Sequence, residues 1–365
     1  MALESIIITR KEKVYHVKYE RKIIMKAAVF YGKEDLRIEE IETPQISTSE
    51  DTLIKVHVCG ICGTDMHIFD GDEGAAPTPK GTVLGHEFSG EIVEVGENVT
   101  SVKVGDRVCV DPNWLCNSCD YCREGIGHFC EDMKGIGTTV NGGFAEYCVV
   151  PQSQVYKFDD GITYASAAMT EPVACCLHGI DMCDIEPGAT VAVIGGGMIG
   201  LLMLQLAKLK GAAKLVMIEP IEEKRIIAQR LGANIAIDPF TQDVSEALKE
   251  NGISRINTVI ECVGKPGTMK QAIEIAGKKS TVMMFGLTKP NDEISIKPFE
   301  FFKKEITLKA SFINPYTQRR ALELINSNKI DVLSMIYKTI SLEELPIILK
   351  NKENRAIGKY VVSFV

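Results

Sequence analysis

The chain has 365 residues, of which 45% are hydrophobic and 25% are charged, and this length predicts two domains because one hydrophobic core rarely serves so long a chain. Its formal net charge of −8 argues against a broad phosphate-binding surface, and so against nucleic acid as a partner. No apolar run reaches the roughly 20 residues that cross a bilayer, and no secretory signal begins the chain, so we expect a cytoplasmic protein with no membrane partner.

The pattern of apolar, charged and glycine residues changes along the chain and divides it into four segments. Residues 1–24, of mixed charge, read as an N-terminal extension, and residues 25–171 show short apolar or alternating runs between glycine-rich turns, which predict a β-rich domain. In residues 172–312 apolar strands alternate with helices, as in a doubly wound parallel sheet. The predicted strands and helices are, in chain order, Thr190–Ile194, Ile199–Leu209, Leu215–Ile218, Glu222–Leu231, Asn257–Cys262, Thr268–Ala276 and Thr281–Phe285. Residues 313–365 resume a helix and strands, and we expect them to return to the first domain.

A first cluster of candidate site residues lies in the β-rich segment. Cys59 and Cys62 have the C-x-x-C spacing of a redox dithiol, but no thioredoxin-like frame surrounds them. If a helical turn follows, Thr64 and His67 share one face of it beside the Cys62 thiol, an arrangement that can pass a proton. Thr64 could equally cap a helix, and His67 could simply lie on the surface.

Further candidate ligands follow later in the same segment. His86 and Glu87 stand side by side after Gly85, and Glu171 precedes a proline that starts a helix. A catalytic zinc ion uses about three protein ligands and leaves one position open, and Cys62, His86 and a glutamate would supply them. Spacing alone does not decide whether Glu87 or Glu171 is the direct ligand.

Four cysteines fall within fifteen residues and form a second cluster. In a reducing compartment such a cluster indicates metal or redox chemistry before disulfides. Four thiolates can close a tetrahedral, structural zinc site, although an iron–sulfur cluster or four unconnected thiols also fit the count. The residues are Cys116, Cys119, Cys122 and Cys130.

A glycine-rich turn in the third segment predicts a dinucleotide site. An apolar strand runs into Gly195-Gly-Gly197-Met198-Ile199-Gly200, and an apolar helix follows. Glycines permit the tight turn and let the backbone approach a pyrophosphate at the helix N-terminus. Glu219 closes the next strand and could accept hydrogen bonds from the adenosine ribose, which favours NAD, although Lys224 and Arg225 nearby leave NADP possible.

Together these residues resemble the zinc-dependent medium-chain alcohol and polyol dehydrogenases, most closely the sorbitol (L-iditol) dehydrogenase-like branch. Gly85-His-Glu-Phe-Ser-Gly90-x5-Gly96-x2-Val99 matches the zinc signature of that family, and the resemblance covers residues 25–365. It implies a GroES-like catalytic domain and a Rossmann coenzyme domain. Simple alcohol dehydrogenases often carry a cysteine where this chain has Glu171, whereas many sorbitol dehydrogenases lack the four-cysteine lobe.

The resemblance also implies a function and roles for the site residues. It implies a catalytic zinc at Cys62 and His86 with Glu87 and Glu171 as direct or water-mediated ligands. It also implies a proton relay through Thr64 and His67, and a role for Asp65 in orienting a zinc ligand. The four-cysteine lobe would hold a second, structural zinc. We expect oxidation of a secondary alcohol, a polyol or vicinal diol, with NAD, in a homo-oligomer that is a tetramer or a dimer. The alternatives are L-threonine 3-dehydrogenase activity, a simple secondary-alcohol dehydrogenase, and a non-catalytic dinucleotide-binding protein.

Overall fold

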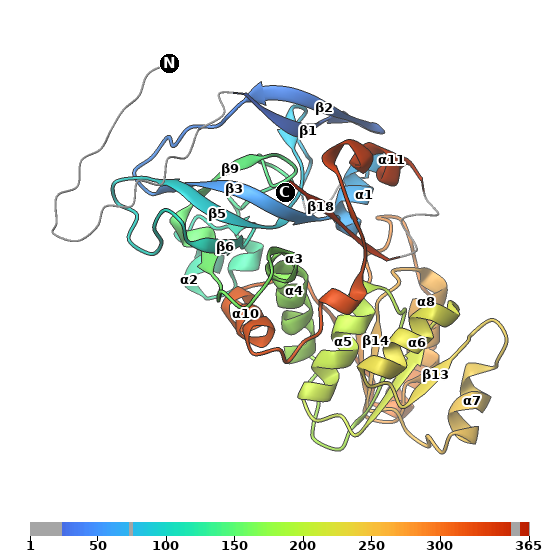
Figure 1. Ribbon diagram of the computed structural model, residues 1–365. Helices are drawn as coiled ribbons and strands as arrows, with labels where there is room; N and C mark the ends of the chain where they lie inside the picture. The colour runs from blue at the N-terminus through green and yellow to red at the C-terminus, as the bar shows by residue number, and fades with distance from the viewer. Residues whose placement is uncertain (1–23, 73–75, 352–357, 365) are drawn as a thin grey trace, which may run out of the picture.

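The structure is a computed structural model that describes residues 24–72, 76–351 and 358–364. The expected N-terminal extension lies outside the described residues except for Ile24, which begins the first strand. Two lobes stand side by side, one built mainly of antiparallel strands and the other of a parallel sheet covered by helices (Figure 1). Within the described ranges no helix is long and apolar enough to cross a membrane.

The first lobe contains a seven-stranded sheet, a three-stranded sheet and a two-stranded ribbon. The large sheet has the order β10-β6-β5-β3-β18-β17, and β9 pairs with β3 outside this path. The smaller sheets are β2-β1-β4 and β7-β8. The strands of this lobe are β1 Ile24–Gly32, β2 Asp35–Glu42, β3 Asp51–Gly60, β4 Thr82–Val83, β5 Glu87–Val95, β6 Arg107–Val110, β7 Asn113–Trp114, β8 Lys134–Gly135, β9 Tyr147–Pro151, β10 Val155–Lys157, β17 Ile336–Ile340 and β18 Lys359–Ser363. Its helices are α1 Gly63–Asp70, α2 Asp120–Arg123, α3 Tyr164–Ala168, α4 Thr170–Asp181, α10 Gln318–Asn326 and α11 Leu345–Lys350.

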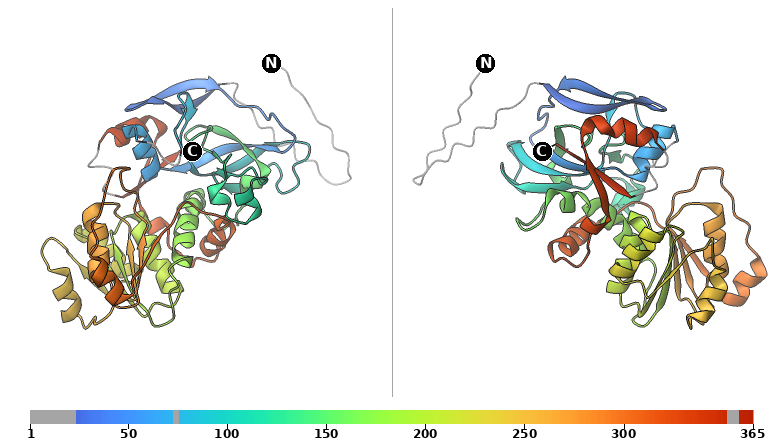
Figure 2. Two further views of the ribbon diagram at one scale, coloured as in Figure 1. Left: turned by 180° about the vertical axis from the view of Figure 1, so that it is seen from behind. Right: turned by 45° about the vertical axis from the view of Figure 1, so that its right-hand side comes forward.

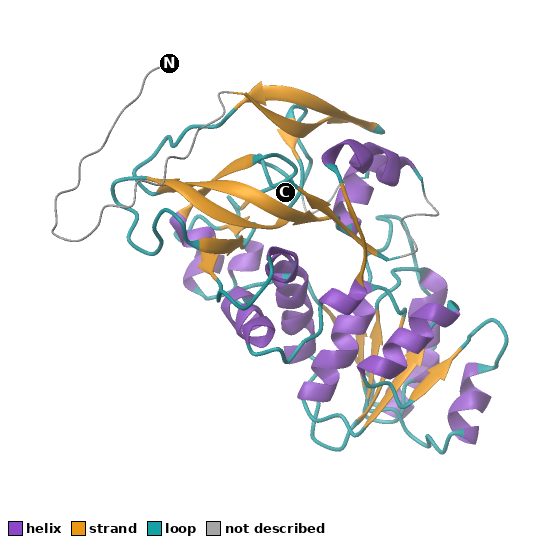
Figure 3. Ribbon diagram, in the orientation of Figure 1, coloured by secondary structure: helices purple, strands orange, loops and turns teal. Residues whose placement is uncertain are grey.

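The second lobe is a six-stranded sheet in which every neighbouring pair of strands is parallel, with helices on both faces (Figures 2 and 3). Its order, β13-β12-β11-β14-β15-β16, reverses at β11, as in a doubly wound dinucleotide-binding sheet. This confirms the predicted parallel sheet. The strands are β11 Thr190–Ile194, β12 Lys214–Ile218, β13 Ile235–Ile237, β14 Thr258–Glu261, β15 Thr281–Met284 and β16 Thr307–Ala310. The helices are α5 Met198–Leu209, α6 Glu222–Leu231, α7 Val244–Glu250, α8 Pro266–Ile275 and α9 Pro298–Lys304.

After leaving the parallel sheet at β16, the chain packs α10 against α4 and then adds β17 and β18 to the first lobe. β18 pairs antiparallel with β3, so residues near the end of the chain lie beside strands near its beginning. The crossing segment is fixed by buried polar groups. Asn314, which is 1% exposed, donates from Nδ2 to Asp111 Oδ1 at 3.3 Å, and Gln318 Nε2 donates to the Val110 carbonyl at 3.0 Å.

Asp111 is a buried carboxyl group at this junction, and burial disfavours its charged form. Burial raises the pKa of Asp111 from 3.8 to about 6, although hydrogen bonds from Asn113 and Asn314 oppose the shift. All three of these hydrogen bonds end on Oδ1. Because the folded chain holds the proton more tightly than the unfolded chain, Asp111 should lower stability as pH rises from about 4 to 6.

We predict that Asp111→Asn stabilises the protein at pH 7 by up to about 3 kcal/mol, since an amide oxygen can keep the three hydrogen bonds without a buried charge. The gain should shrink as the pH falls from 6 toward 4 and vanish below about pH 3, where Asp111 is protonated in both the folded and the unfolded state. Thermal unfolding of both proteins across this pH range measures it, with the exposed Asp132→Asn as control. A gain that does not depend on pH would contradict the assignment.

Candidate active site

Helix α1 begins just beyond the end of β3 and fixes the position of Cys62 there. The chain leaves β3 at Gly60, and Cys62 is the residue that caps the N-terminus of α1. Asp65, three residues later, is completely buried, and its Oδ2 accepts the backbone N–H of Cys62 at 2.8 Å. This reciprocal capping arrangement holds the start of the helix, so the Cys62 thiol has a fixed position.

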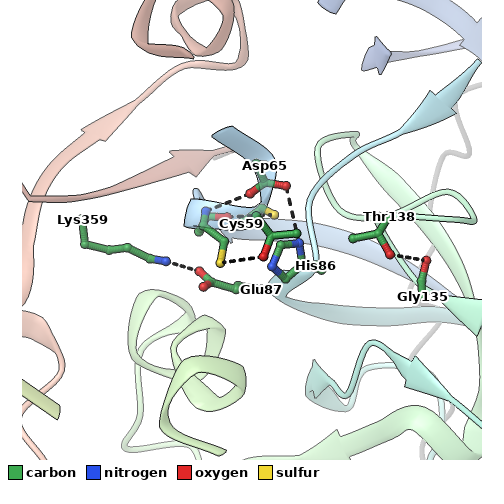
Figure 4. A network of polar contacts seen from close by, with 10 residues as sticks. Cys59, Asp65, His86, Glu87, Gly135, Thr138 and Lys359 are labelled. Atoms are coloured by element: carbon green, nitrogen blue, oxygen red, sulfur yellow. Dashed lines mark hydrogen bonds and ion pairs between the residues drawn. The ribbon is translucent and has the colours of Figure 1, made fainter. Parts of the chain in front are cut away.

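The second oxygen of Asp65 orients His86 (Figure 4). Asp65 Oδ1 lies 3.4 Å from His86 Nδ1, which leaves Nε2 as the ring atom that can bind a ligand. Burial alone would lower the pKa of His86, but the Asp65 carboxylate and the Cys62 thiol outweigh it and raise the pKa well above the ordinary value. Gly85 makes the approach possible because its φ is +95° and a Cβ there would lie 2.8 Å from the backbone nitrogen of Phe144.

Glu87, the first residue of β5, is 1% exposed and pairs with Lys359, the first residue of β18 (Figure 4). Lys359 is itself buried, and burial lowers its pKa, but Glu87 and other acidic groups outweigh this and raise it. Glu87 and Lys359 thus form a buried ion pair although they are 272 positions apart in sequence. The sequence analysis missed Lys359, because a lysine at the head of an apolar strand usually marks an exposed strand end.

The structure brings three of the four expected ligands of the open site together. One ligand atom from each of Cys62, His86 and Glu87 lies within 4.8 Å of the others. Glu171, on the first turn of α4, is not part of this group, and its Oε1 accepts a hydrogen bond from Cys175 Sγ at 3.1 Å. It nevertheless belongs to the same electrostatic environment: burial raises the pKa of Glu171 to about 7, His86 opposes the shift and Glu87 adds to it.

This set of donors suits zinc. A thiolate, an imidazole nitrogen and a carboxylate oxygen are the ligand types that zinc binds in catalytic sites, and three of them leave a position for another ligand. Asp65 holds the imidazole from behind, as outer carboxylates do in histidine-containing zinc sites.

The two residues of the expected proton relay have different surroundings. Thr64 lies next to the site, with its Oγ1 3.8 Å from Cys62 Sγ. His67, on the last turn of α1, places Nδ1 3.4 Å from Asp72 Oδ2, and its side chain is 32% exposed. Thr64 therefore faces the reacting region, whereas His67 has access to solvent.

The four cysteines of the second cluster also converge. One sulfur from each of Cys116, Cys119, Cys122 and Cys130 lies within 4.8 Å of the others, around helix α2 and the turn that follows it. The Ser118 hydroxyl and the N–H groups of Ser118 and Cys119 lower the pKa of Cys116 to about 6. A thiol that ionises near neutral pH is prepared to bind a metal ion.

The glycine-rich turn connects β11 to α5. Gly195 has a φ of +98°, Gly197 caps α5, and a Cβ on Gly200 would collide with the Gly195 carbonyl oxygen. Met198 and Ile199 form the first turn of α5, whose N–H groups are open to a phosphate. Glu219 lies immediately after β12, and its Oε2 accepts the N–H of Gly196 at 2.6 Å, so the acid and the glycine turn are in contact.

Fold and site together define the class of a dinucleotide-dependent oxidoreductase, in which Cys62, His86 and Glu87 could hold a metal ion. Residues 48–160 match the family model of the alcohol dehydrogenase GroES-like domain, and residues 199–327 match that of zinc-binding dehydrogenases.

Two related proteins and one solved structure, all dehydrogenases, are also similar to this chain. The chain is 39% identical to L-threonine 3-dehydrogenase of Caldanaerobacter subterraneus subsp. tengcongensis over 73% of this chain and 76% of that protein. It is 36% identical to sorbitol dehydrogenase of Halalkalibacterium halodurans over 80% of this chain and 85% of that protein. A structure from Sinorhizobium meliloti 1021, assigned as a zinc-binding dehydrogenase bound to NADP, is 36% identical, has a TM-score of 0.90, and is matched over 94% of this chain and 100% of its own.

The chain therefore belongs to the zinc-dependent medium-chain alcohol and polyol dehydrogenase family, which confirms the resemblance and the fold class expected from the sequence. Membership supports zinc and a nicotinamide nucleotide as cofactors and a small molecule as substrate.

The buried ion pair between Glu87 and Lys359 can be tested by substitution. Lys359→Met should destabilise the protein by about 3–5 kcal/mol, because Glu87 would remain buried without its partner. The double variant Lys359→Met/Glu87→Gln should recover most of this loss, since no uncompensated charge remains. Denaturant unfolding of the two variants measures the difference, and equal stability of single and double variants would contradict the account.

Proposed function

We propose that this protein oxidises a secondary hydroxyl group of a polyol or vicinal diol and transfers the hydride to NAD. The observation that carries the proposal is the convergence of Cys62, His86 and Glu87 beside a second buried acid, Glu171. A non-catalytic dinucleotide-binding protein would have no use for such a set of ligands.

Cys62 and His86 would hold the catalytic zinc ion, with Glu87 or Glu171 as the third ligand. When bound, zinc supplies Lewis-acid activation of the alcohol hydroxyl, which lowers the pKa of that group. Asp65 keeps His86 Nδ1 engaged, so the imidazole presents Nε2 in a fixed orientation. Lys359 offsets the charge of Glu87 and so limits the negative charge that the ligands gather in the buried site.

Cys116, Cys119, Cys122 and Cys130 would hold a second zinc ion in a closed, structural site. Four thiolates complete its coordination and leave no position for a substrate.

The proton released from the alcohol would leave by way of Thr64 and His67. Thr64 is placed beside Cys62, and His67 reaches solvent and Asp72. Glu171, whose pKa of about 7 lies near neutrality, is a second acceptor for the same proton.

NAD is the proposed coenzyme because of the surroundings of Glu219. A carboxylate here would bind ribose hydroxyls and repel a 2′-phosphate. Arg225, which could attract that phosphate, is already engaged: Nη1 donates to the carbonyls of Glu219 and Pro220 at 2.8 and 2.7 Å and lies 3.3 Å from Asp238 Oδ2. The Sinorhizobium relative binds NADP, so the preference needs a direct test.

Glu219→Ala should lower the ratio of kcat/KM for NAD over NADP by about 10- to 150-fold, which corresponds to about 1.5–3 kcal/mol for hydrogen bonds to a charged group. Steady-state kinetics with both coenzymes measures the ratio, and Glu222→Ala, an exposed acid on α6, is the control. An unchanged ratio in Glu219→Ala would show that Glu219 does not select the coenzyme.

The substrate prediction rests on the acidic character of the site. A vicinal diol can present one hydroxyl for hydride transfer and donate a hydrogen bond from the other to Glu171. We therefore expect butane-2,3-diol to have a higher kcat/KM than butan-2-ol, by the factor of about 5 to 150 that corresponds to about 1–3 kcal/mol. Steady-state kinetics with NAD on this matched pair, and on sorbitol against L-threonine, measures it.

Each alternative function has its own outcome in this experiment. Equal turnover of butane-2,3-diol and butan-2-ol would make the protein a simple secondary-alcohol dehydrogenase. Reaction with L-threonine alone would identify the activity named for the Caldanaerobacter relative. No turnover of any alcohol would contradict the proposal as a whole.

We also propose a homodimer formed through β16, either alone or as half of a tetramer. β16 pairs with β15 on one side, and in the described residues its other edge has no partner strand. Phe299, Phe302 and Leu308 near this edge are 69%, 79% and 41% exposed. A paired edge would cover both the strand and this apolar surface.

Phe302→Glu should therefore weaken the dimer, because a charge would be buried at its interface. Analytical ultracentrifugation should show a dimer or tetramer for the unmodified chain and a shift to smaller species for Phe302→Glu. Phe240→Glu, which changes an exposed phenylalanine near the opposite edge strand, serves as control. A monomeric unmodified chain would contradict the proposal.

A further inference from the structure

Glu171 has a specific neighbour that the mechanism above does not use. Cys175 lies four residues later on α4, one turn along the helix, and its thiol donates to Glu171 Oε1 at 3.1 Å. Among the hydrogen bonds of the described chain, this is the bond that fixes the Glu171 carboxylate. The other carboxylate oxygen, Oε2, remains available to another group.

The thiol is held in place by a second acceptor. Cys175 Sγ lies 3.7 Å from Asn314 Oδ1, and a thiol has one proton, so the shorter contact to Glu171 is the better hydrogen bond. Asn314 cannot easily move, since its Oδ1 also accepts from Asn113 Nδ2 and its Nδ2 donates to Asp111. The surroundings of Cys175 therefore come from both α4 and the segment that returns from the parallel sheet.

We propose that Cys175 is a positioning residue that holds Glu171 Oε1 and so directs Oε2 toward the metal site. The inference rests on the proposed function and takes Glu171, of the two glutamates named there, as the one that serves the catalytic zinc. A carboxylate with one oxygen held by a donor loses rotational freedom, and its free oxygen then binds a cation at a lower entropic cost. The neighbouring Cys176 makes a different contact, since its thiol lies 3.9 Å from the Ile199 carbonyl, and no hydrogen bond joins it to Glu171 in the described chain.

Three variants separate positioning from packing. Cys175→Ala removes the donor, Cys175→Ser retains a donor of similar size, and Cys176→Ala removes an adjacent buried thiol that makes no hydrogen bond to Glu171. The readouts are the dissociation constant for Zn²⁺, from competition with a chelator, and the visible absorption of the Co²⁺-substituted protein. Signals from the Cys116 lobe cancel in the differences between variants.

Cys175→Ala should weaken zinc binding at the open site by about 10-fold or more and change the cobalt spectrum, as loss of an outer ligand partner does. Cys175→Ser should restore both, and Cys176→Ala should leave both unchanged. If Cys175→Ala does not fold, Cys175→Val, which fills the space without a donor, makes the same comparison.

An unchanged dissociation constant and cobalt spectrum in Cys175→Ala or Cys175→Val would overturn the inference. Equal effects of Cys175→Ala and Cys176→Ala would also overturn it, since they would show a packing effect. The proposed function fails in a different way, because then the unmodified protein would bind no zinc at the open site or oxidise no alcohol.

Discussion

The Asp65 carboxylate is the contact that keeps the two parts of the candidate active site in register. Its Oδ2 holds the N–H of Cys62 at the start of α1, and its Oδ1 faces Nδ1 of His86 on the neighbouring loop. The carboxylate is fully buried, so both contacts act where water does not compete. The pairing of Gly60 with Glu87 brings these two loops together, and the Asp65 carboxylate then fixes how the thiol and the imidazole are oriented toward each other.

A second constraint comes from the far end of the chain. Lys359 on β18 places a positive charge against Glu87 on β5, and β18 can do so because it pairs with β3 in the same sheet. The Asp111–Asn314 contact similarly fixes the segment that enters this last part of the fold. The site therefore depends on residues that follow the parallel sheet in sequence, since β18, near the end of the chain, lies in the first lobe beside β3 (Figure 1).

Site features whose residues lie close together in the sequence could be predicted from the sequence alone. The glycine turn with Glu219, the four cysteines and the His86-Glu87 pair could all be predicted, because each needs particular residues within a few positions. The apolar strands from Thr190–Ile194 to Thr281–Met284 were also found from their continuous hydrophobic runs. In contrast, the short or exposed elements β13, α7, α9 and β16 have no strong periodicity, and the sequence analysis did not identify them.

What the sequence could not provide were contacts between distant positions. Lys359 with Glu87 and Asn314 with Cys175 are separated by 272 and 139 residues, and neither pair has a local signal. Cys175 looks like an ordinary apolar position of a buried helix until the fold places Glu171 and Asn314 around its thiol. The role of Asp65 was expected only from the family resemblance, since a buried acid on a short helix is otherwise typical of a cap.

Anomalous X-ray diffraction at the zinc absorption edge, from crystals of the purified protein, tests the central claim most directly. The account predicts two zinc peaks in each chain, one bounded by Cys62, His86 and a glutamate and one among the four cysteines of the Cys116 lobe. A peak at the lobe alone, from protein that retains its zinc through purification, would contradict the claim that the open site binds the catalytic metal.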